Sequence, residues 1–262
     1  MKFIRFKPKN NQTILQGIIT DHGIQQIEGD MFTDWELTES IYSPDNIEFL
    51  KPLTPRHVIG IGANYVAKPD DLPAEAPELP VFFYKPVSSV VGSGKSIVIP
   101  QGISEVKFES ELAAVIGKTA SNLAEEEVTD HIFGYTVGND VTAPHYFHED
   151  GHWMVGKSFD TFTPLGPYIE TEFDLDNAHV EAYLNGEKKQ DSPTANMIVS
   201  IRKMIAYLSG VMTLEPGDVI LTGSPIGAEM MKAGDEIVCS IDGIGELHNL
   251  VEQKVNVHLQ QK

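Results

Sequence analysis

Two glutamates stand two residues apart where the chain enters an apolar run, in the segment FESELAAVIGK (108–118). In a strand, residues i and i+2 point to the same face about 7 Å apart, so the carboxylates of Glu109 and Glu111 would lie side by side. At a separation of about 5 Å and an effective dielectric constant of about 20, their repulsion costs on the order of 3 kcal/mol before desolvation is counted. The pair therefore predicts a nearby cation that offsets this repulsion.

A third acid, Asp140, follows a mostly apolar strand in FGYTVGNDVTAP (133–144) and precedes a turn that contains proline. Three carboxylates without sulfur or an obligatory imidazole form a hard oxygen site, which suits Mg²⁺ or Mn²⁺. Spacing alone leaves an alternative open. In that alternative, Glu109 and Glu111 line a solvated face of a sheet and Asp140 only caps a turn.

Two further motifs suggest a zinc site and a nucleotide site, but each lacks residues that such a site requires. His145, His148 and His152 lie in one short stretch, yet no nearby cysteine or HExxH helix accompanies them, so we interpret them as loop or substrate-contact histidines rather than zinc ligands. GSGKS (92–96) imitates the end of a phosphate-binding loop, but the first glycine of that motif would fall on Ser89. The sequence therefore predicts neither a zinc site nor a nucleotide site.

Composition limits the kind of partner. The chain has 262 residues, enough for one main domain with a small appendage. Its 19 Lys and Arg residues against 38 Asp and Glu residues give a formal charge of −19, which opposes nucleic acid and anionic membranes as partners. An anionic substrate must therefore be attracted by a local cation rather than by the field of the whole molecule.

The single cysteine and the N-terminus indicate the compartment. Cys239 cannot form an internal disulfide, and its setting in EIVCSI is typical of a buried strand. MKFIRFKPKN lacks the apolar stretch of a signal peptide, and no run approaches the ~20 apolar residues of a membrane span. We expect a cytoplasmic protein with no membrane partner.

Short buried strands punctuated by Gly and Pro dominate the chain from Pro52 onward. Residues 1–50 contain shorter strands with turns and predict a small N-terminal subdomain, which leaves 51–262 as the main domain. Because regular helices do not separate the strands, a doubly wound sheet is disfavoured. The pattern predicts a mixed, strand-rich roll or barrel.

Helical patterns are few. SNLAEEEVTDHIF (121–133) has Ser121 as a candidate N-cap and acids in its early turns. TANMIVSIRKMIAYLSG (194–210) has an apolar stripe that includes Met197 and Leu208 and stops at Gly210. We expect both segments to be helical.

The chain resembles the fumarylacetoacetate hydrolase family in five ordered motifs: FESELAAVIGK, GYTVGNDVTA, GKSFDTFTPLGP, LEPGDVILTGSPIG and GIGELHN. The similarity runs from about residue 53 to the C-terminus, and PVFFYKPVSSVVGSGKSIVIP (80–100) matches the strand pair that precedes the family's metal site. The resemblance implies an α+β, predominantly β fold, a mixed β-sandwich roll of the family's C-terminal type, usually found as a homodimer. It also implies that 51–262 is the catalytic domain.

The resemblance also assigns residues of this chain to roles. It implies that Glu109, Glu111 and Asp140 bind the Mg²⁺ or Mn²⁺ ion, and that Lys157 of the GKSFD motif is a charged catalytic group. A cation held by three carboxylates keeps about three octahedral positions free, so a 2-oxo acid can chelate it and an enolate is stabilised. Lys157 can bind the substrate carboxylate or hold the developing negative charge.

Two polar residues follow as candidate substrate contacts. Ser224 falls where the family commonly has threonine in a Gly-Thr-Pro motif, so a hydroxyl for substrate binding is retained. Gln190 falls on a glutamine that is common in the family.

The chain departs from the family at a lid. Hydrolytic and decarboxylating members commonly carry a histidine a few residues after an Asn-Tyr pair and a glutamate three residues further on, as an acid/base dyad. This chain has Lys68 and Asp71 at those positions, after Tyr65, in a Pro- and acid-rich segment (66–80) that we expect to be a mobile lid. Without the imidazole, activation of water at neutral pH loses its usual base.

A second departure follows Asp140, where Pro144 and His145 replace the Arg and Asp of a common Ala-Arg-Asp segment. We expect Lys68 and Asp71 to take part in catalysis, and Tyr65 and His145 to contact the substrate.

These losses favour a reaction that needs enolate stabilisation and proton movement without an activated water. The expectation is a decarboxylase or isomerase of 2-oxo or 2-hydroxy dienoic diacids, similar to the 2-hydroxyhepta-2,4-diene-1,7-dioate isomerase of homoprotocatechuate catabolism. The alternatives are an acylpyruvate or fumarylpyruvate C–C hydrolase, an oxaloacetate decarboxylase, and a noncatalytic metabolite-binding protein on the same fold. Each of them takes a small anionic molecule as its partner.

Overall fold

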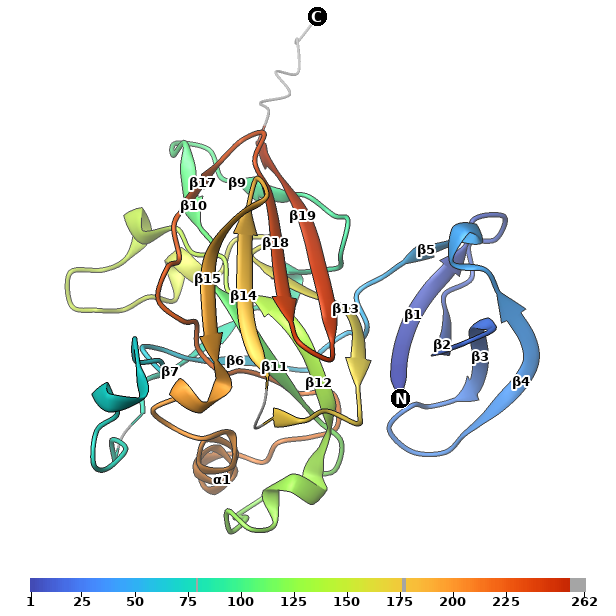
Figure 1. The fold of residues 1–262 in the computed structure, drawn as a ribbon, viewed down its shortest axis with the longest axis horizontal. Helices are drawn as coiled ribbons and strands as arrows, with labels where there is room; N and C mark the ends of the chain where they lie inside the picture. Colours follow the sequence, from blue (N-terminus) through green and yellow to red (C-terminus); the bar gives the residue numbers. More distant parts are fainter. Residues whose placement is uncertain (79, 176–177, 255–262) are drawn as a thin grey trace, which may run out of the picture.

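The computed structural model describes residues 1–78, 80–175 and 178–254. Within these ranges the chain forms nineteen strands, one α-helix and several short 3-10 helices, so it is predominantly β as predicted (Figure 1). None of the helices in these ranges is long and apolar enough to cross a membrane.

The largest sheet has twelve strands and extends from the N-terminal strands to the strand at residues 82–85. It contains β1 (Lys2–Pro8), β2 (Leu15–Thr20), β3 (Gly23–Gly29), β4 (Trp35–Tyr42), β5 (Ile47–Phe49), β6 (Val58–Ile61), β7 (Phe82–Lys85), β8 (Val90–Val91), β11 (Ser110–Ile116), β12 (Ile132–Asn139), β13 (Thr163–Glu170) and β16 (Val219–Leu221). Its main path runs β4-β3-β2-β1-β13-β12-β11-β16-β6-β7, with β5 paired to β1 and β8 paired to β13.

A five-stranded sheet packs against the β11–β13 part of the large sheet (Figure 1). Its order is β15 (Glu187–Pro193), β14 (His179–Leu184), β18 (Glu236–Ile241), β19 (Gly245–Gln253) and β9 (Ile97–Ile99). A separate ribbon pairs β10 (Glu105–Lys107) with β17 (Met230–Lys232). The buried side chains of Leu112, Val137, Ala182, Cys239 and Leu247 belong to one hydrophobic core shared by the two large sheets, which confirms the predicted sandwich roll and the buried position of Cys239.

Strands β1–β5 form the N-terminal lobe, drawn in blue in Figure 1. They continue the large sheet, because β1 pairs with β13 through Lys2 with Glu170 and Phe3 with Ile169. Phe3 also packs edge-on against Trp35, with ring centroids 5.4 Å apart. The predicted subdomain is therefore present as a β-lobe, while the boundary between 1–50 and 51–262 stays a prediction.

The α-helix α1 (Ile201–Val211) begins after Ser200, whose Oγ accepts a hydrogen bond from the Lys203 N–H at 3.2 Å. Its buried residues include Ile201, Met204 and Leu208 of the predicted apolar stripe, and Ile205 beside them. The expected helix over 194–210 is wrong before residue 201, because Met197 instead pairs with Tyr65 in an isolated β-bridge.

The helix expected over 121–133 is wrong as a whole, since only Val128–His131 form a short 3-10 turn. Local hydrogen bonds compete with the helix. Asn122 has a φ of 53°, its N–H bonds the Ser209 carbonyl, and the Glu127 carboxylate accepts the Ala124 N–H at 2.8 Å.

The two serines give a test of this difference. Ser200→Ala removes a helix cap and should lower the free energy of unfolding by about 1 kcal/mol. Ser121→Ala, the matched control, caps no helix and should change it by less than about 0.5 kcal/mol. Urea unfolding followed by circular dichroism measures both variants, and equal losses would show that the Ser200 cap contributes nothing specific.

Candidate metal centre

The ends of β11 and β12 bring the three predicted acids together. Glu109 precedes β11, Glu111 lies in it and Asp140 follows β12, and the register of Ser110 with Asn139 sets these ends side by side. One carboxylate oxygen of each acid lies within 4.8 Å of those of the other two. Glu111 and Asp140 are only 1% and 0% exposed, so the alternative of a solvated sheet face is wrong.

Hydrogen bonds hold the backbone of Glu109 and the carboxylate of Glu111 in place. The Asn139 side chain accepts the Glu109 N–H at 3.0 Å, and the Asp140 N–H donates to the Glu109 carbonyl at 2.9 Å. Glu111 Oε2 accepts the Gly223 N–H at 2.8 Å. Gly223 has a φ of 92°, and a Cβ there would lie 2.6 Å from the Asn64 Cβ, so glycine is required where the backbone donates to Glu111.

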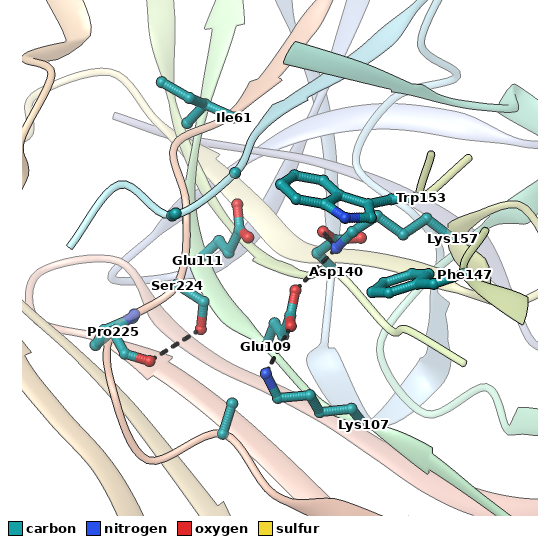
Figure 2. Close-up of a pocket in the computed structure, with 13 residues that line it drawn as sticks. Ile61, Lys107, Glu109, Glu111, Asp140, Phe147, Trp153, Lys157, Ser224 and Pro225 are labelled. Atoms are coloured by element: carbon teal, nitrogen blue, oxygen red, sulfur yellow. Dashed lines mark hydrogen bonds and ion pairs between the residues drawn. The ribbon is translucent and has the colours of Figure 1, made fainter. Parts of the chain in front are cut away.

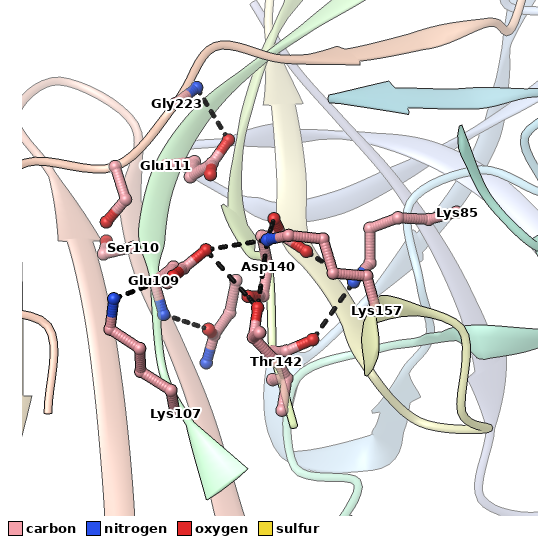
Figure 3. A network of polar contacts seen from close by, with 12 residues as sticks. Lys85, Lys107, Glu109, Ser110, Glu111, Asp140, Thr142, Lys157 and Gly223 are labelled. Atoms are coloured by element: carbon pink, nitrogen blue, oxygen red, sulfur yellow. Dashed lines mark hydrogen bonds and ion pairs between the residues drawn. The ribbon is translucent and has the colours of Figure 1, made fainter. Parts of the chain in front are cut away.

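Three lysines surround the acids (Figure 3). Lys157 Nζ donates to Asp140 Oδ2 and, at 2.9 Å, to Glu109 Oε2. Lys85, fully enclosed, donates to Asp140 Oδ1 at 2.5 Å. Lys107 donates to Glu109 Oε1 at 3.0 Å. Two of the acids are therefore each held between two ammonium groups.

Burial and charge act differently on each group. Burial raises the pKa of Glu111 well above its usual value, and the charges of Asp140 and Glu109 raise it further. Burial would also raise the pKa of Asp140, but the Lys157 and Lys85 ammonium groups lower it below its usual value. Burial opposes the charge of Lys157, yet Asp140 and Glu109 raise its pKa, so Lys157 stays protonated. Glu111 is thus the acid whose charge the protein compensates least.

The donor set fits a divalent cation. All three acids offer carboxylate oxygen, which Mg²⁺ and Mn²⁺ prefer, and the oxygens are already close together. The hydrogen bond that the described residues give Glu111 uses Oε2, so its second oxygen is available to an ion. Glu109, Glu111 and Asp140 can therefore hold the metal.

A cavity of about 290 Å³ opens above the acids (Figure 2). Lys157 and Ser224 line it, and Phe147 and Trp153 form part of an apolar wall. The Trp153 ring lies against Gly62, where a Cβ would come within 2.1 Å of the indole. A small metabolite can therefore reach the acids and contact an aromatic surface at the same time.

Gln190 supports the cavity from behind. Its Oε1 accepts the Ser110 N–H at 3.0 Å, so its Nε2 faces Ser224 Oγ at 2.8 Å and the Pro225 carbonyl at 2.6 Å. The amide donates to Ser224 Oγ, and the serine hydroxyl in turn donates to the Pro225 carbonyl at 3.5 Å (Figure 2). Gln190 thus positions Ser224 and does not itself line the cavity.

Four other predicted residues are not brought into this cavity. Lys68, Asp71 and His145 are exposed and do not line it. Tyr65 is buried behind it, and burial, with the charge of Glu111, raises the pKa of its hydroxyl. Residue 79 of the expected lid (66–80) lies outside the described ranges. The lid and the roles of these four residues stay predictions.

Sequence reasoning missed several residues of the site. Lys85 ends the apolar strand β7, and a lysine in that position was a usable signal of a buried ion pair. Lys107 shares a strand face with Glu109 by its i, i+2 spacing, which was a second signal. Phe147 and Trp153 come from a loop and carried no comparable signal.

Comparison with known proteins gives matches over nearly the whole chain. Residues 57–252 match the model of the fumarylacetoacetate (FAA) hydrolase C-terminal family, and residues 1–52 match a family described as Rv2993c-like, N-terminal. The mitochondrial oxaloacetate tautomerase of Xenopus laevis is 40% identical over 226 residues, covering 81% of this chain and 71% of that protein.

Solved structures agree with this match. A 2-hydroxyhepta-2,4-diene-1,7-dioate isomerase from Mycobacterium marinum has a TM-score of 0.87 at 33% identity, covering 98% of this chain and all of that one. A maleylpyruvate hydrolase from Sphingobium sp. SYK-6, in complex with manganese(II) and pyruvate, has a TM-score of 0.81 at 27% identity, covering 97% of this chain and all of that one.

The metal site can be tested by thermal unfolding. Saturating Mg²⁺ should raise the Tm of the wild type, because an ion at ~100 times its Kd stabilises the folded state by ~2.7 kcal/mol. Glu111→Gln should abolish this increase, since it removes a ligand. It should also leave the Tm of the chelator-treated protein unchanged or higher, since the amide has no charged form to desolvate, whereas burial disfavours the ionised form of Glu111.

Glu105→Gln is the matched control, because Glu105 lies on the neighbouring strand β10 outside the acid cluster. A full Mg²⁺-dependent increase in Tm that survives in Glu111→Gln would place the metal elsewhere.

Proposed function

Because the chain belongs to the fumarylacetoacetate hydrolase family, we propose that it is a divalent-metal-dependent isomerase that moves a proton between carbon and oxygen in a 2-oxo diacid. The observation that carries the proposal is the buried cluster of Glu109, Glu111 and Asp140 beneath one cavity that Lys157 also lines. The tautomerase and isomerase activities named for two similar proteins support the same type of chemistry.

A Mg²⁺ or Mn²⁺ ion held by Glu109, Glu111 and Asp140 would supply Lewis-acid charge that offsets negative charge developing on the substrate. Lys157 adds a fixed positive charge, and because its pKa is raised it holds its protons and stabilises an oxyanion rather than acting as a base. Ser224 lines the cavity, and its hydroxyl hydrogen can turn from the Pro225 carbonyl, 3.5 Å away, to the substrate. Phe147 and Trp153 cover part of the cavity with apolar surface and limit access of water.

Hydrolysis of a C–C bond is the less favoured reaction. Such hydrolysis needs a base that activates water, and the residues that line the cavity include no histidine. His145 is exposed and outside the cavity. Isomerisation needs no activated water, so these residues support it better.

The proposed reaction can be tested with oxaloacetate as the substrate. Ultraviolet absorbance follows conversion of its enol to the ketone, and a separate assay follows release of pyruvate. We expect Mg²⁺ or Mn²⁺ to support tautomerisation, a chelator to abolish it, and pyruvate to form no faster than without protein. Lys157→Met should lower kcat/KM about 100-fold, or ~2.7 kcal/mol, because it removes the fixed charge.

Lys232→Gln is the matched control, since this exposed lysine of β17 lies outside the cavity and should keep full activity. Rapid pyruvate release would indicate a decarboxylase instead. Full activity after removal of metal would refute the mechanism, and metal-dependent binding without turnover of any 2-oxo diacid would indicate a noncatalytic binding protein.

A further inference from the structure

Lys107 is held rigidly at its backbone while its side chain reaches the cavity. It ends β10, pairs with Met230 of β17, and exchanges two backbone hydrogen bonds with Thr142, at 2.7 and 2.9 Å. Its side chain is 35% exposed and lines the cavity together with Lys157. The position of this ammonium group is therefore defined by two neighbouring segments of the fold.

The two lysines of the cavity differ in how fully they are engaged. They bond opposite oxygens of Glu109, Lys107 at Oε1 and Lys157 at Oε2 (Figure 2). Lys157 is buried and also bonds Asp140 and Thr142. Within the described residues, Lys107 has Glu109 as its one side-chain partner, although an ammonium group has three hydrogens to donate. Lys107 therefore keeps donors for a ligand.

The net charge around the cavity depends on Lys107. The three acids of the cluster carry three negative charges when ionised, and Lys107 and Lys157 return two positive charges to the cavity lining. With the Lys85 ammonium group at Asp140 counted as well, a divalent ion would make the site positive by two charges, and removal of Lys107 would halve that excess. The rest of the chain opposes anions, since the whole molecule has a formal charge of −19.

We propose that Lys107 binds the second carboxylate of the substrate and so selects diacids over monoacids. This inference rests on the proposed function, in which the 2-oxo acid end of the substrate lies at the acid cluster. Lys107 contacts Glu109 at the edge of that cluster, on the side of Glu109 away from Lys157 (Figure 2). Lys68 and His145, two residues expected to act in the site, do not line the cavity.

The test is calorimetric binding of two ligands that differ only in the second carboxylate, 2-oxoglutarate and 2-oxopentanoate, to the Mg²⁺-loaded protein. The wild type should prefer 2-oxoglutarate. Lys107→Gln should weaken 2-oxoglutarate about tenfold and 2-oxopentanoate less than about twofold, since a charge-assisted contact is lost only with the diacid. Lys107→Arg should retain the preference, and Lys232→Gln, from the paired strand β17, should behave as wild type.

Binding of Mg²⁺ alone separates this role from a structural one. Lys107 competes with the ion for Glu109, so Lys107→Gln should bind Mg²⁺ at least as tightly as the wild type. Weaker Mg²⁺ binding with equal losses for both ligands would mean that Lys107 only orders Glu109, and would overturn the inference.

Three other outcomes distinguish this inference from its alternatives and from the proposed function. A selective loss with Lys68→Ala but not with Lys107→Gln would assign the second carboxylate to the lid and overturn the inference. Wild-type protein that binds neither ligand with Mg²⁺ would overturn both the inference and the proposed function. A preference that depends on Lys107, in a protein that turns over no 2-oxo diacid, would support the inference and refute only the proposed reaction.

Discussion

The mutual repulsion of three carboxylates at the ends of β11 and β12 is the constraint on which the rest of the site depends. An uncompensated buried charge costs several kcal/mol, so each acid needs a partner. Glu109 and Asp140 obtain theirs from lysines on β10, β7 and the segment around Lys157, and Glu111 obtains a backbone N–H from Gly223. These contacts hold elements that are far apart in the sequence around the acid cluster. Among the described residues Glu111 has no ammonium partner, so its carboxylate can bind a metal ion.

Part of this arrangement could be read from the sequence because it is local. The i, i+2 spacing predicted that Glu109, which directly precedes β11, lies beside Glu111, whereas Asp140, which follows β12, reaches them through the pairing of β11 with β12. The predominantly β fold and the stripe of α1 followed from the same periodicities. Lys85 could not be placed, because its contact with Asp140 joins residues 55 positions apart through tertiary packing.

The wrong helix over 121–133 and the untested roles of Lys68 and His145 have different origins. Segment 121–133 has helical composition, but its polar groups bond within the segment and to Ser209 of α1, which outweighs a weak helical preference. Lys68 was assigned by alignment to the histidine of a missing dyad, and His145 to the aspartate of a missing Arg-Asp pair. Alignment does not fix where an exposed loop lies. The cations that line the cavity come instead from regular or tightly bonded segments, where the backbone determines the direction of the side chain.

The contact of Trp153 with Gly62 gives the protein an internal optical label. The chain has only two tryptophans, Trp153 at the cavity and Trp35 in the N-terminal lobe against Phe3. Their indole rings therefore lie in separate environments, one at the cavity and one beside the junction of β1 with β13. Emission from a protein that retains only one of the two would follow events at the cavity and at the lobe independently, without an added dye.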